Sequence, residues 1–433
     1  MVSIRGRAPT AQETFMQMAQ SAGLRNRLLV TIGVLILVRL GIYIPIPGID
    51  RVVFGKVVSG NTVINFLDIF SGGGLSLLGV FALGIIPYIN ASIIMQLMTA
   101  ALPTLENLQK NEGEAGRRKI SQYTRYATLI WGAIQGLGIA LWIQGVGAAT
   151  NPGLTFVLET TLALTAGSMF VMWAGELITE KGVGNGASLL IFISIVSGLP
   201  KSLSNTIALA NQDSSRVGGI ITLFLVFLVM IVGIVFVQEG TRRIPIVSAR
   251  RQVGRKTYRE QSAYLPLKLN QGGVMPIIFA SSVMILPATI GQFSNNPVLR
   301  DIAGFLAPNT WGYVVVYLLL ILAFSFFYSS LVVDPKDLAQ NLKKMGSSIP
   351  GIRPGTATSE YISGVLNRLT FLGAIFLGVV AIVPTVVERA TGVQTFSGIG
   401  ATSLLILVGV AIETARQIQT YVISQRYEGM VKQ

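Results

Sequence analysis

The sequence predicts an all-α polytopic membrane protein with ten transmembrane helices. Its 433 residues are 51% hydrophobic and only 12% charged, whereas a soluble globular protein is roughly 25% charged. The apolar residues gather in ten long stretches, and each stretch must be helical because backbone amides in lipid have no water to bond. The stretches lie near residues 28–44, 75–100, 124–143, 154–176, 186–204, 217–237, 273–290, 311–332, 369–387 and 400–419.

Residues 1–27 are predicted to form an amphipathic segment ahead of the first span. Arg5 and Arg7 are followed by a polar, glutamine-rich stretch, unlike the apolar core of a cleavable signal. Thr10 and Glu13 have the spacing of a helix capping box. We therefore expect a short helix here, lying either in the membrane interface or in water.

The distribution of Lys and Arg predicts which side of the membrane holds the termini. Ten spans place both termini on one side, and 26 of the 33 Lys and Arg residues fall on that side. Six fall on the other side. Arg39 lies inside the first span near its outer end, where its side chain could extend to the interface. Because positive charge accumulates on the cytoplasmic side, we expect both termini in the cytoplasm.

A loop at 205–216 divides the spans into two groups of five. An odd number of spans gives two similar halves opposite orientations in the membrane, as in many transport proteins. We therefore predict two inverted five-helix halves, at 28–204 and 217–419, joined by an external hinge loop at 205–216 and followed by a cytoplasmic tail at 420–433.

One apolar segment, residues 62–70, is too short to be a span. As a helix, its nine residues would cover about 14 Å, less than half of a ~30 Å hydrocarbon core. Residues 71–74, with the sequence SGGG, follow it and provide a hinge of high backbone freedom. The pattern is typical either of a re-entrant plug or of an interfacial loop helix.

Prolines and polar residues interrupt the apolar stretches. Pro87, Pro276, Pro287 and Pro384 are helix breakers inside apolar runs, which membrane helices tolerate as kinks. Polar side chains accompany the first three prolines and could either bond across a helix interface or serve ordinary packing. They are Asn90, Ser92 and Gln96 in the second stretch and Ser281 and Ser282 in the seventh.

The residue types that are missing exclude several functional classes. The chain contains no Cys and no His, which excludes disulfides and His- or Cys-based metal sites and catalysis. The sequence has no Walker A motif and no clear mid-membrane carboxylate of the kind that ion-coupled carriers use. We expect a passive pore or a scaffold, with no enzyme activity, cofactor or metal. An inverted-repeat secondary transporter of a small solute is the alternative.

Two connections between spans, at 238–272 and 333–368, run to about 35 residues each, whereas helix pairs usually need 2–8. The first carries a basic cluster far from the membrane, composed of Arg250, Arg251, Arg255, Lys256 and Arg259. Attraction to anionic lipid explains charges close to the membrane. Phosphates or an acidic protein surface would pair with charges at the tip, and we favour a docking site there.

Six runs along the chain carry a resemblance to a known family. They are RLGIYIPIPGID (39–50), FALGIIPYINASIIMQL (81–97), GRRKISQYTRY (116–126), MWAGELITEKGVGNGASLLIF (172–192), FASSVMILPATI (279–290) and NLKKMGSSIPGIRPG (341–355). Their order and spacing resemble those of the SecY family, the channel-forming subunits of bacterial and plastid protein translocases. The resemblance covers essentially the whole chain.

The resemblance implies two five-helix halves around a central pore, closed by a plug and by a ring of aliphatic side chains. The plug would be the segment at 62–74, including Thr62, Ile64, Asn65, Phe66, Leu67, Asp68, Phe70, Gly72, Gly73 and Gly74. The ring would consist of Ile85, Ile89, Ala187, Ile191, Ile278 and Ile406. Ala187 departs from the isoleucine familiar at that position, so the plug is expected to carry more of the closure.

The resemblance also implies a lateral gate between spans and a docking surface on the cytoplasmic loops. The gate residues would be Asn90, Ser92, Gln96, Ser281, Ser282, Leu286 and Pro287. The docking residues would be Arg243, Arg250, Arg251, Arg255, Lys256, Arg259, Lys268 and Arg353.

The activity implied is the passage of unfolded secretory polypeptides through the pore and the lateral release of transmembrane segments into lipid. The implied partners are the ATPase SecA, the ribosome with its RNA and exit-site proteins, the small subunits SecE and SecG, and polypeptides with signal sequences. No small-molecule substrate is expected. The implied location is a bacterial plasma membrane or a thylakoid membrane.

Overall fold

The computed structural model of the protein describes residues 22–51, 53–55, 68, 71–212, 217–248, 252–253, 256–257, 262–293, 297–307, 310–391 and 400–431. The helix expected near Thr10 and Glu13 lies outside these residues. So do most of the short segment 62–70 and part of the tip of the loop at 238–272.

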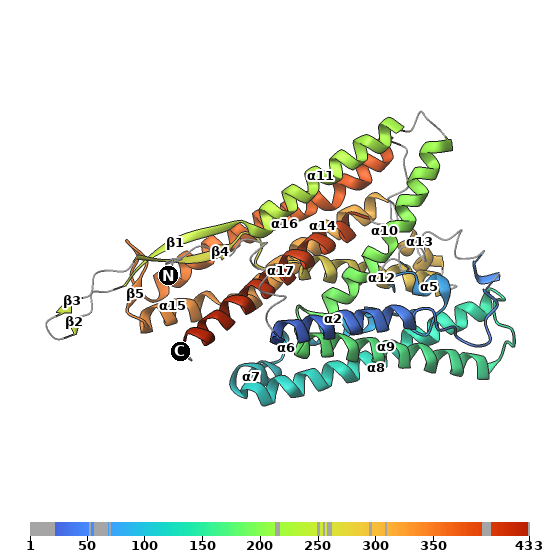
Figure 1. The fold of residues 1–433 in the computed structure, drawn as a ribbon, viewed down its shortest axis with the longest axis horizontal. Coiled ribbons are helices and arrows are strands. Elements are labelled where there is room, and N and C mark those ends of the chain that lie inside the picture. The colour runs from blue at the N-terminus through green and yellow to red at the C-terminus, as the bar shows by residue number, and fades with distance from the viewer. Residues whose placement is uncertain are drawn as a thin grey trace. The chain divides into compact units, whose positions relative to one another are not determined.

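Helices occupy all ten of the predicted apolar stretches (Figure 1). The second stretch is divided, and each of the others holds one long helix. These helices are α2 (Ala22–Gly41), α8 (Gly113–Gly145), α9 (Leu154–Lys181), α10 (Gly186–Gln212), α11 (Val217–Glu239), α12 (Met275–Phe293), α14 (Trp311–Val332), α16 (Thr356–Thr391) and α17 (Gly400–Val431). A short helix, α13 (Pro297–Phe305), lies between α12 and α14.

Six helices among the described residues are long and apolar enough to cross a membrane. They lie in α8, α9, α10, α11, α14 and α16, and α6 with α7 would add a seventh crossing as a bent pair. These helices make the chain an integral, multi-pass membrane protein. Crossings by α2, α12 and α17 stay predictions from the sequence.

The second stretch differs from the single helix expected over 75–100. Helix α5 (Gly74–Leu77) ends after one turn, and α6 (Ile86–Ala101) begins only after a turn that includes Gly84. Gly84 has a φ of +54°, a conformation that favours glycine. Pro87 lies in the first turn of α6, where its missing N–H leaves no helical hydrogen bond unmade. The expected kink at Pro87 is therefore wrong, because this proline begins a helix rather than bending one.

Backbone contacts fix the turn between α5 and α6. The amide of Ile46 donates to the carbonyl of Leu78 (3.2 Å), and the amide of Val80 donates to the carbonyl of Ile44 (2.9 Å). Gly167 of α9 allows a close approach, because a Cβ there would lie 2.0 Å from the carbonyl oxygen of Val80. The start of α6 is thus held against the residues after α2 and against α9.

Helix α7 (Pro103–Asn111) follows α6 after a bend of 103°. Pro103 is at the start of α7. Because the proline ring disfavours the helical conformation of the residue before it, the helix breaks at Leu102. Leu102 is extended, with φ −105° and ψ 115°. Helix α7 packs along the N-terminal part of α8.

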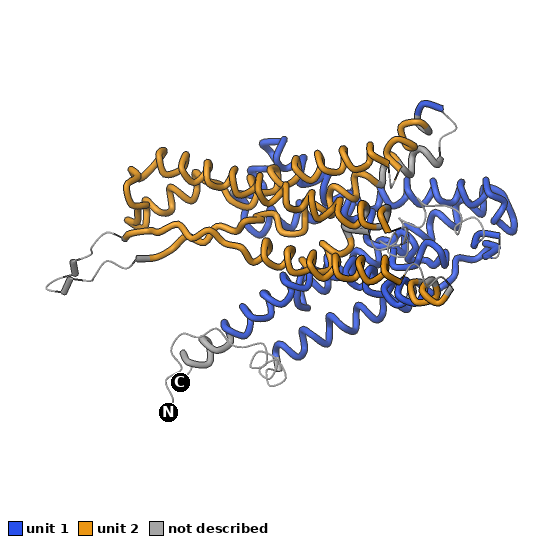
Figure 2. Tube along the Cα trace, turned by 90° about the horizontal axis from the view of Figure 1, so that it is seen from above, with its two compact units in different colours: residues 1–204, 288–300, 410–433 blue, residues 205–287, 301–409 orange. Residues whose placement is uncertain are grey.

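The described residues separate into two compact units (Figure 2). Unit 1 comprises residues 1–204, 288–300 and 410–433, and unit 2 comprises residues 205–287 and 301–409. In unit 1, α8 packs along α6 and α9, and in unit 2, α16 packs along α11 and α14. The inversion of two five-helix halves stays a prediction.

The two long loops contain structure that we did not predict, because both contribute to one sheet in unit 2. Strands β1 (Thr241–Ser248) and β4 (Ser262–Lys268) form an antiparallel hairpin, and β5 (Ser347–Ser348) pairs with the end of β1. Two short strands, β2 (Gln252–Val253) and β3 (Lys256–Thr257), pair between β1 and β4. Helix α15 (Pro335–Lys344) precedes β5.

A hydrophobic core joins this sheet to the helices of unit 2. Ile244 and Ile246 of β1 and Leu267 of β4 are buried against Leu342 of α15 and Ile362 of α16. Alternate residues of a strand point to opposite faces. Arg243 and other exposed residues therefore lie on the face of the hairpin that points away from this core. The two loops therefore form a small sheet and a helix that pack on α16.

Candidate functional site: plug hinge, ring, gate and docking surface

The residues expected in the pore ring are divided between the two units. Ile85, Ile89, Ala187 and Ile191 belong to unit 1, and Ile278 and Ile406 belong to unit 2. The amide of Ile89 donates to the carbonyl of Ile85 (3.1 Å), so these two side chains lie one turn apart on the same side of α6. All five isoleucines are buried, and Ala187 is partly buried. The ring itself stays a prediction.

The segment at 62–74, which is expected to be the plug, is described only from Asp68 onward. Asp68, Gly72, Gly73 and Gly74 are described, and the other plug residues lie outside the described part: Thr62, Ile64, Asn65, Phe66, Leu67 and Phe70. Gly72 and Gly73 have φ values of +68° and +89°, which side chains with a Cβ rarely adopt. The SGGG segment is thus a tight turn that needs glycine, placed directly after the plug.

The carboxylate of Asp68 closes this turn onto α5. Its Oδ1 accepts from the amide of Ser76 (2.8 Å) and from Oγ of Ser71 (3.1 Å), and its Oδ2 accepts from Oγ of Ser76. The carbonyl of Asp68 accepts from the amide of Gly73 (2.9 Å). Ser71 in turn accepts at its Oγ from the amide of Leu75 (3.0 Å). The one charged residue of the segment 62–74 is therefore joined to the start of α5.

Arg39 bonds to the same turn, and the extension of its side chain to the membrane interface stays a prediction. Its Nη1 donates to the carbonyl oxygen of Gly72 at 2.7 Å. Gly72 has little room, because a Cβ there would lie 2.5 Å from Nη1 of Arg39 and 3.0 Å from Cα of Ser194. The turn is therefore wedged between the end of α2 and the middle of α10.

The polar residues expected in the lateral gate bond mainly within their own helices. Nε2 of Gln96 donates to Oγ of Ser92 (3.3 Å) along α6. Oγ of Ser281 donates to the carbonyl of Ile277 (2.7 Å) along α12. Ser282 is buried, and Pro287 lies inside α12 together with Leu286, whose side chain is not described.

Asn90 differs from the other gate residues. It is buried, and its Nδ2 has no hydrogen-bond partner among the described residues. Because α6 and this part of α12 belong to different units, the gate stays a prediction.

Two of the expected docking residues share one exposed face of the hairpin. In the register of β1 and β4, Lys268 lies opposite Thr241, and Pro266 lies opposite Arg243. Arg243 and Lys268 are thus diagonal neighbours on the face away from the core, about 7–8 Å apart at the backbone. Both side chains are exposed. Among the described residues neither forms an ion pair, so both charges are available to a partner.

The remaining docking residues are only partly described. Arg353 is exposed just before α16, where its carbonyl accepts from Oγ1 of Thr358 (2.8 Å). The backbone of Lys256 lies in β3, but its side chain is not described. Arg250, Arg251, Arg255 and Arg259 lie outside the described residues.

A turn of glycines joins α9 to α10 and is fastened to α2. Oγ1 of Thr31 accepts from the amide of Val183 (3.0 Å), and Nη1 of Arg27 donates to the carbonyl of Gly182 (3.4 Å). The guanidinium of Arg27 also lies 5.0 Å from the centre of the Tyr421 ring of α17, within the range of a cation–π interaction. Three segments of unit 1 therefore meet at Arg27. The same turn positions Ala187 and Ile191 at the start of α10.

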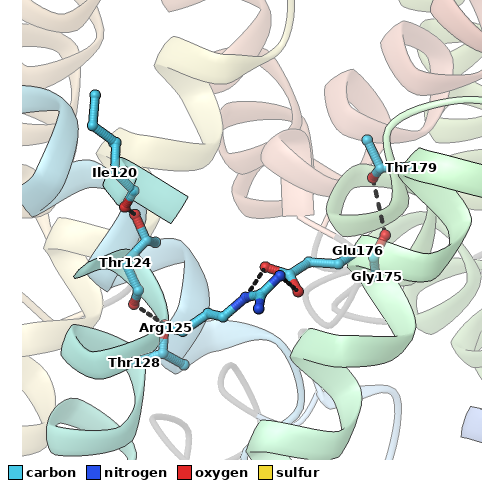
Figure 3. A network of polar contacts seen from close by, with 7 residues as sticks. All are labelled: Ile120, Thr124, Arg125, Thr128, Gly175, Glu176 and Thr179. Atoms are coloured by element: carbon cyan, nitrogen blue, oxygen red, sulfur yellow. Dashed lines mark hydrogen bonds and ion pairs between the residues drawn. The ribbon is translucent and has the colours of Figure 1, made fainter. Parts of the chain in front are cut away.

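An ion pair joins α8 to α9 in unit 1 (Figure 3). Nε of Arg125 donates to Oε1 of Glu176 (3.0 Å), and Nη2 lies 3.0 Å from Oε2, so the pair is bidentate. The side chain of Glu176 is only 17% exposed. Oγ1 of Thr128 on the same face of α8 donates to the carbonyl of Thr124 (2.7 Å). No local pattern predicts this pair, because its members lie 51 residues apart.

Replacing Glu176 should destabilise the protein more than breaking an exposed pair. The Glu176→Gln variant loses a bidentate contact in which the carboxylate side chain is 17% exposed and the arginine side chain 45% exposed. We expect a loss of about 1 kcal/mol of unfolding free energy, measured by denaturant titration in micelles. The matched control is Glu112→Gln, because Glu112 pairs with Lys119 at 3.2 Å with both side chains about half exposed. That variant should change stability by less than about 0.5 kcal/mol. Equal effects of the two variants would contradict a structural role of the buried pair.

A signal in the sequence could have revealed the hairpin. Ile244 and Ile246 alternate with Arg243 and Pro245, and the second strand shows the same period of two, which is typical of a strand with one buried face. The contact of Arg39 with Gly72 has no such signal, because it joins residues 33 positions apart.

Comparison with known proteins identifies close relatives. The SecY family model matches residues 79–415. Protein translocase subunit SecY of Synechococcus elongatus is 67% identical over 440 residues, which cover 100% of both chains. The corresponding subunit of Synechocystis sp. is 64% identical, again over 100% of both chains. That of Aquifex aeolicus is 44% identical over 94% of this chain and 97% of its own.

Solved structures share the fold. A protein-conducting channel matches with a TM-score of 0.62 and 18% identity over 92% of both chains. A channel whose structure addresses the plug domain of SecY matches with a TM-score of 0.64 and 16% identity, again over 92% of both. Sec61 in the canine ribosome-channel complex matches with a TM-score of 0.59 and 17% identity over the same shares. The resemblance seen in the sequence and the polytopic helical fold class are thereby confirmed.

Proposed function

The chain belongs to the SecY family of protein translocase subunits, and from this membership we propose that it forms the channel through which a translocase moves unfolded polypeptides across a membrane. The observation that carries the proposal is the hinge after the short segment 62–70. Two glycines with positive φ values join that segment to a turn wedged between α2 and α10. A segment too short to span the membrane, tethered in this way, has the properties of a plug.

The plug and an aliphatic ring would close the resting channel together. A ring of branched apolar side chains excludes ions by dewetting, and it yields to a passing polypeptide because no covalent or polar contact holds it shut. Ile85, Ile89, Ile191, Ile278 and Ile406 would supply this ring. Ala187 has a smaller side chain, so the plug would cover the gap that it leaves.

Hydrophobic segments would leave the channel sideways. A stretch of ~20 apolar residues gains free energy by moving from an aqueous pore into lipid. By the family resemblance, the exit would lie between α6 and α12, with Asn90 as one of the gate residues on α6. The Nδ2 of Asn90 is buried without a partner in the described part of the chain.

The hairpin and Arg353 would receive the partner that drives transport. Exposed Arg243 and Lys268 share one face, and arginine and lysine bind phosphates and acidic protein surfaces. We infer that SecA or the ribosome docks here, and that SecE and SecG complete the complex. Two of the structural relatives are channels in complex with a ribosome. The proposed location is the plasma membrane or the thylakoid membrane of a photosynthetic bacterium, with both termini in the cytoplasm.

Reconstitution tests the proposal directly. The chain is placed in liposomes together with SecE and SecA, and a secretory precursor is added outside. On addition of ATP the precursor should become protected from protease. Liposomes that lack this chain, and complete liposomes without ATP, are the controls. A precursor that stays sensitive to protease in the complete system would contradict the channel assignment, and coupled uptake of a small solute would favour the transporter instead.

A further inference from the structure

The short helix α13 has an exposed apolar face. Val298, Ile302 and Phe305 recur at intervals of four and three residues, which places them on one side of the helix. Their exposed fractions are 60%, 47% and 63%. Gly304, which is also exposed, lies about 200° around the helix from Ile302. Helix α13 is therefore amphipathic, and its apolar face is turned outward.

The end of α13 is fixed to the beginning of α14. Oγ1 of Thr310 donates to the carbonyl of Phe305 (2.6 Å) and accepts from the amide of Tyr313 (3.2 Å). Gly312 allows Phe305 to approach, because a Cβ at Gly312 would lie 2.5 Å from Cε1 of the Phe305 ring. The end of α13 and the first turn of α14 thus form one corner, which leaves the position of α13 to be set by that of α14.

Helix α14 shows where the membrane surface lies. It is long and apolar enough to cross a membrane. Trp311, Val315 and Leu319 recur every four residues along it and are exposed, so they form a stripe that faces lipid. Tryptophan is enriched where a membrane helix meets water. Trp311 is the first residue of α14, and it therefore places the membrane surface at the corner with α13.

At this place the apolar face of α13 has lipid within reach. Its nine residues would cover about 14 Å, too little to cross a ~30 Å hydrocarbon core. Phe305 lies against Gly312, the neighbour of Trp311, so the exposed apolar side chains of α13 continue into the lipid-facing stripe of α14. Exposed apolar surface of this kind marks a site of contact, and an amphipathic helix at a membrane surface inserts its apolar face among the lipids.

We propose that α13 lies in the membrane surface where α14 begins, with Val298, Ile302 and Phe305 inserted among the lipids and Gly304 turned to water. Together with Trp311, the helix would fix the depth at which α14 enters the bilayer. The inference rests on the multi-pass membrane class of the chain and not on the channel role. Either one can fail while the other stands.

Spin labels at single cysteines test the insertion. The chain contains no cysteine, so Ile302→Cys and Gly304→Cys each create one labelling site in the full chain, which is reconstituted in vesicles of phosphatidylcholine and phosphatidylglycerol. Collisions of the label with oxygen, which concentrates in lipid, and with a water-soluble nickel chelate report its depth. The label at position 302 should lie about 5–10 Å below the level of the lipid phosphates.

Gly304→Cys is the matched control on the same helix. A Cβ at Gly304 meets no atom within 4 Å, so the substitution should leave the fold intact, and its label should lie at or above the phosphates. Val298→Cys is a second variant on the apolar face and should give the depth found at position 302. Labels at Val315 and Leu319 provide a ruler, because four residues of a helix rise by about 6 Å.

Two results would overturn the proposal. If nickel reaches the labels at positions 302 and 304 equally, α13 lies in water. If the labels at 298 and 302 are shielded from both oxygen and nickel, protein covers the apolar face, and magnetic coupling between labels would then identify a second copy of the chain as the cover. High oxygen access with low nickel access at 298 and 302, and the reverse at 304, would support insertion among lipids.

Discussion

Deletion of residues 62–70 should produce the largest change in resting ion conductance of any variant considered for this protein. The expected increase is about tenfold or more, which corresponds to about 1.4 kcal/mol or more in favour of the conducting state, because the whole proposed closing segment is removed. Ala187 is the physical reason, since its methyl group leaves space where a larger aliphatic side chain would complete the ring. Single-channel recording of the complex without a translocating chain measures the effect.

A second substitution shows whether the ring is the remaining barrier. Ala187→Ile in the deletion background should lower the conductance again, because the longer side chain fills the gap. Ala187 is only partly buried near the start of α10, so the added atoms need little space in the packed core. A silent bilayer for the deletion alone would mean that the ring seals without the plug.

Reversing the two charges of the hairpin should weaken docking of SecA or the ribosome roughly 10- to 100-fold at low salt. Each lost contact of an exposed charge costs about 0.7–1.4 kcal/mol, so the two together cost about 1.4–2.8 kcal/mol, and each 1.4 kcal/mol corresponds to a factor of ten in affinity. The variant combines Arg243→Glu and Lys268→Glu, whose side chains share one exposed face of the sheet. Equilibrium binding to the reconstituted complex measures the loss, and the salt dependence of binding should become shallower because fewer counterions are released.

Arg368→Glu is the matched control for the hairpin. Arg368 is an exposed arginine on α16 in the same unit. Its replacement by Glu changes the net charge as much as either hairpin substitution does, but it leaves the hairpin face unchanged. Its effect on binding should be small and removed by salt. Equal losses in the two variants would indicate a general electrostatic attraction rather than docking at the hairpin.

The loops show how far prediction from sequence reaches. Their length and charge indicate a surface feature, but loop composition does not predict strands. Only the alternation of buried and exposed residues around Ile244 and Ile246 indicates them. Strand β5 could not be predicted at all, since its two residues pair with β1 from a position about 100 residues away. Such a short strand has no pattern of its own and exists only because the packing of α15 and α16 places it there.

The second span shows the opposite case. Its composition predicts a continuous apolar helix with a kink at Pro87, whereas Pro87 begins α6. The break at Gly84 depends on hydrogen bonds to residues 44–46 and on the absence of a side chain at Gly167. These partners belong to other segments of the chain, so the sequence around Gly84 alone does not predict the break in the helix.

The sequence by itself determined the membrane class, the positions of the apolar helices and the family. These follow from hydropathy and from long motifs, which are sums over neighbouring residues and do not depend on what lies across the fold. Only the tertiary structure decided which partner each isolated polar group takes. In a medium with little water, Arg39 and Glu176 bond to whatever the packing brings within 3 Å, and those acceptors and donors lie tens of residues away along the chain. The contact of Arg39 with Gly72 is for this reason a property of the fold and not of any motif.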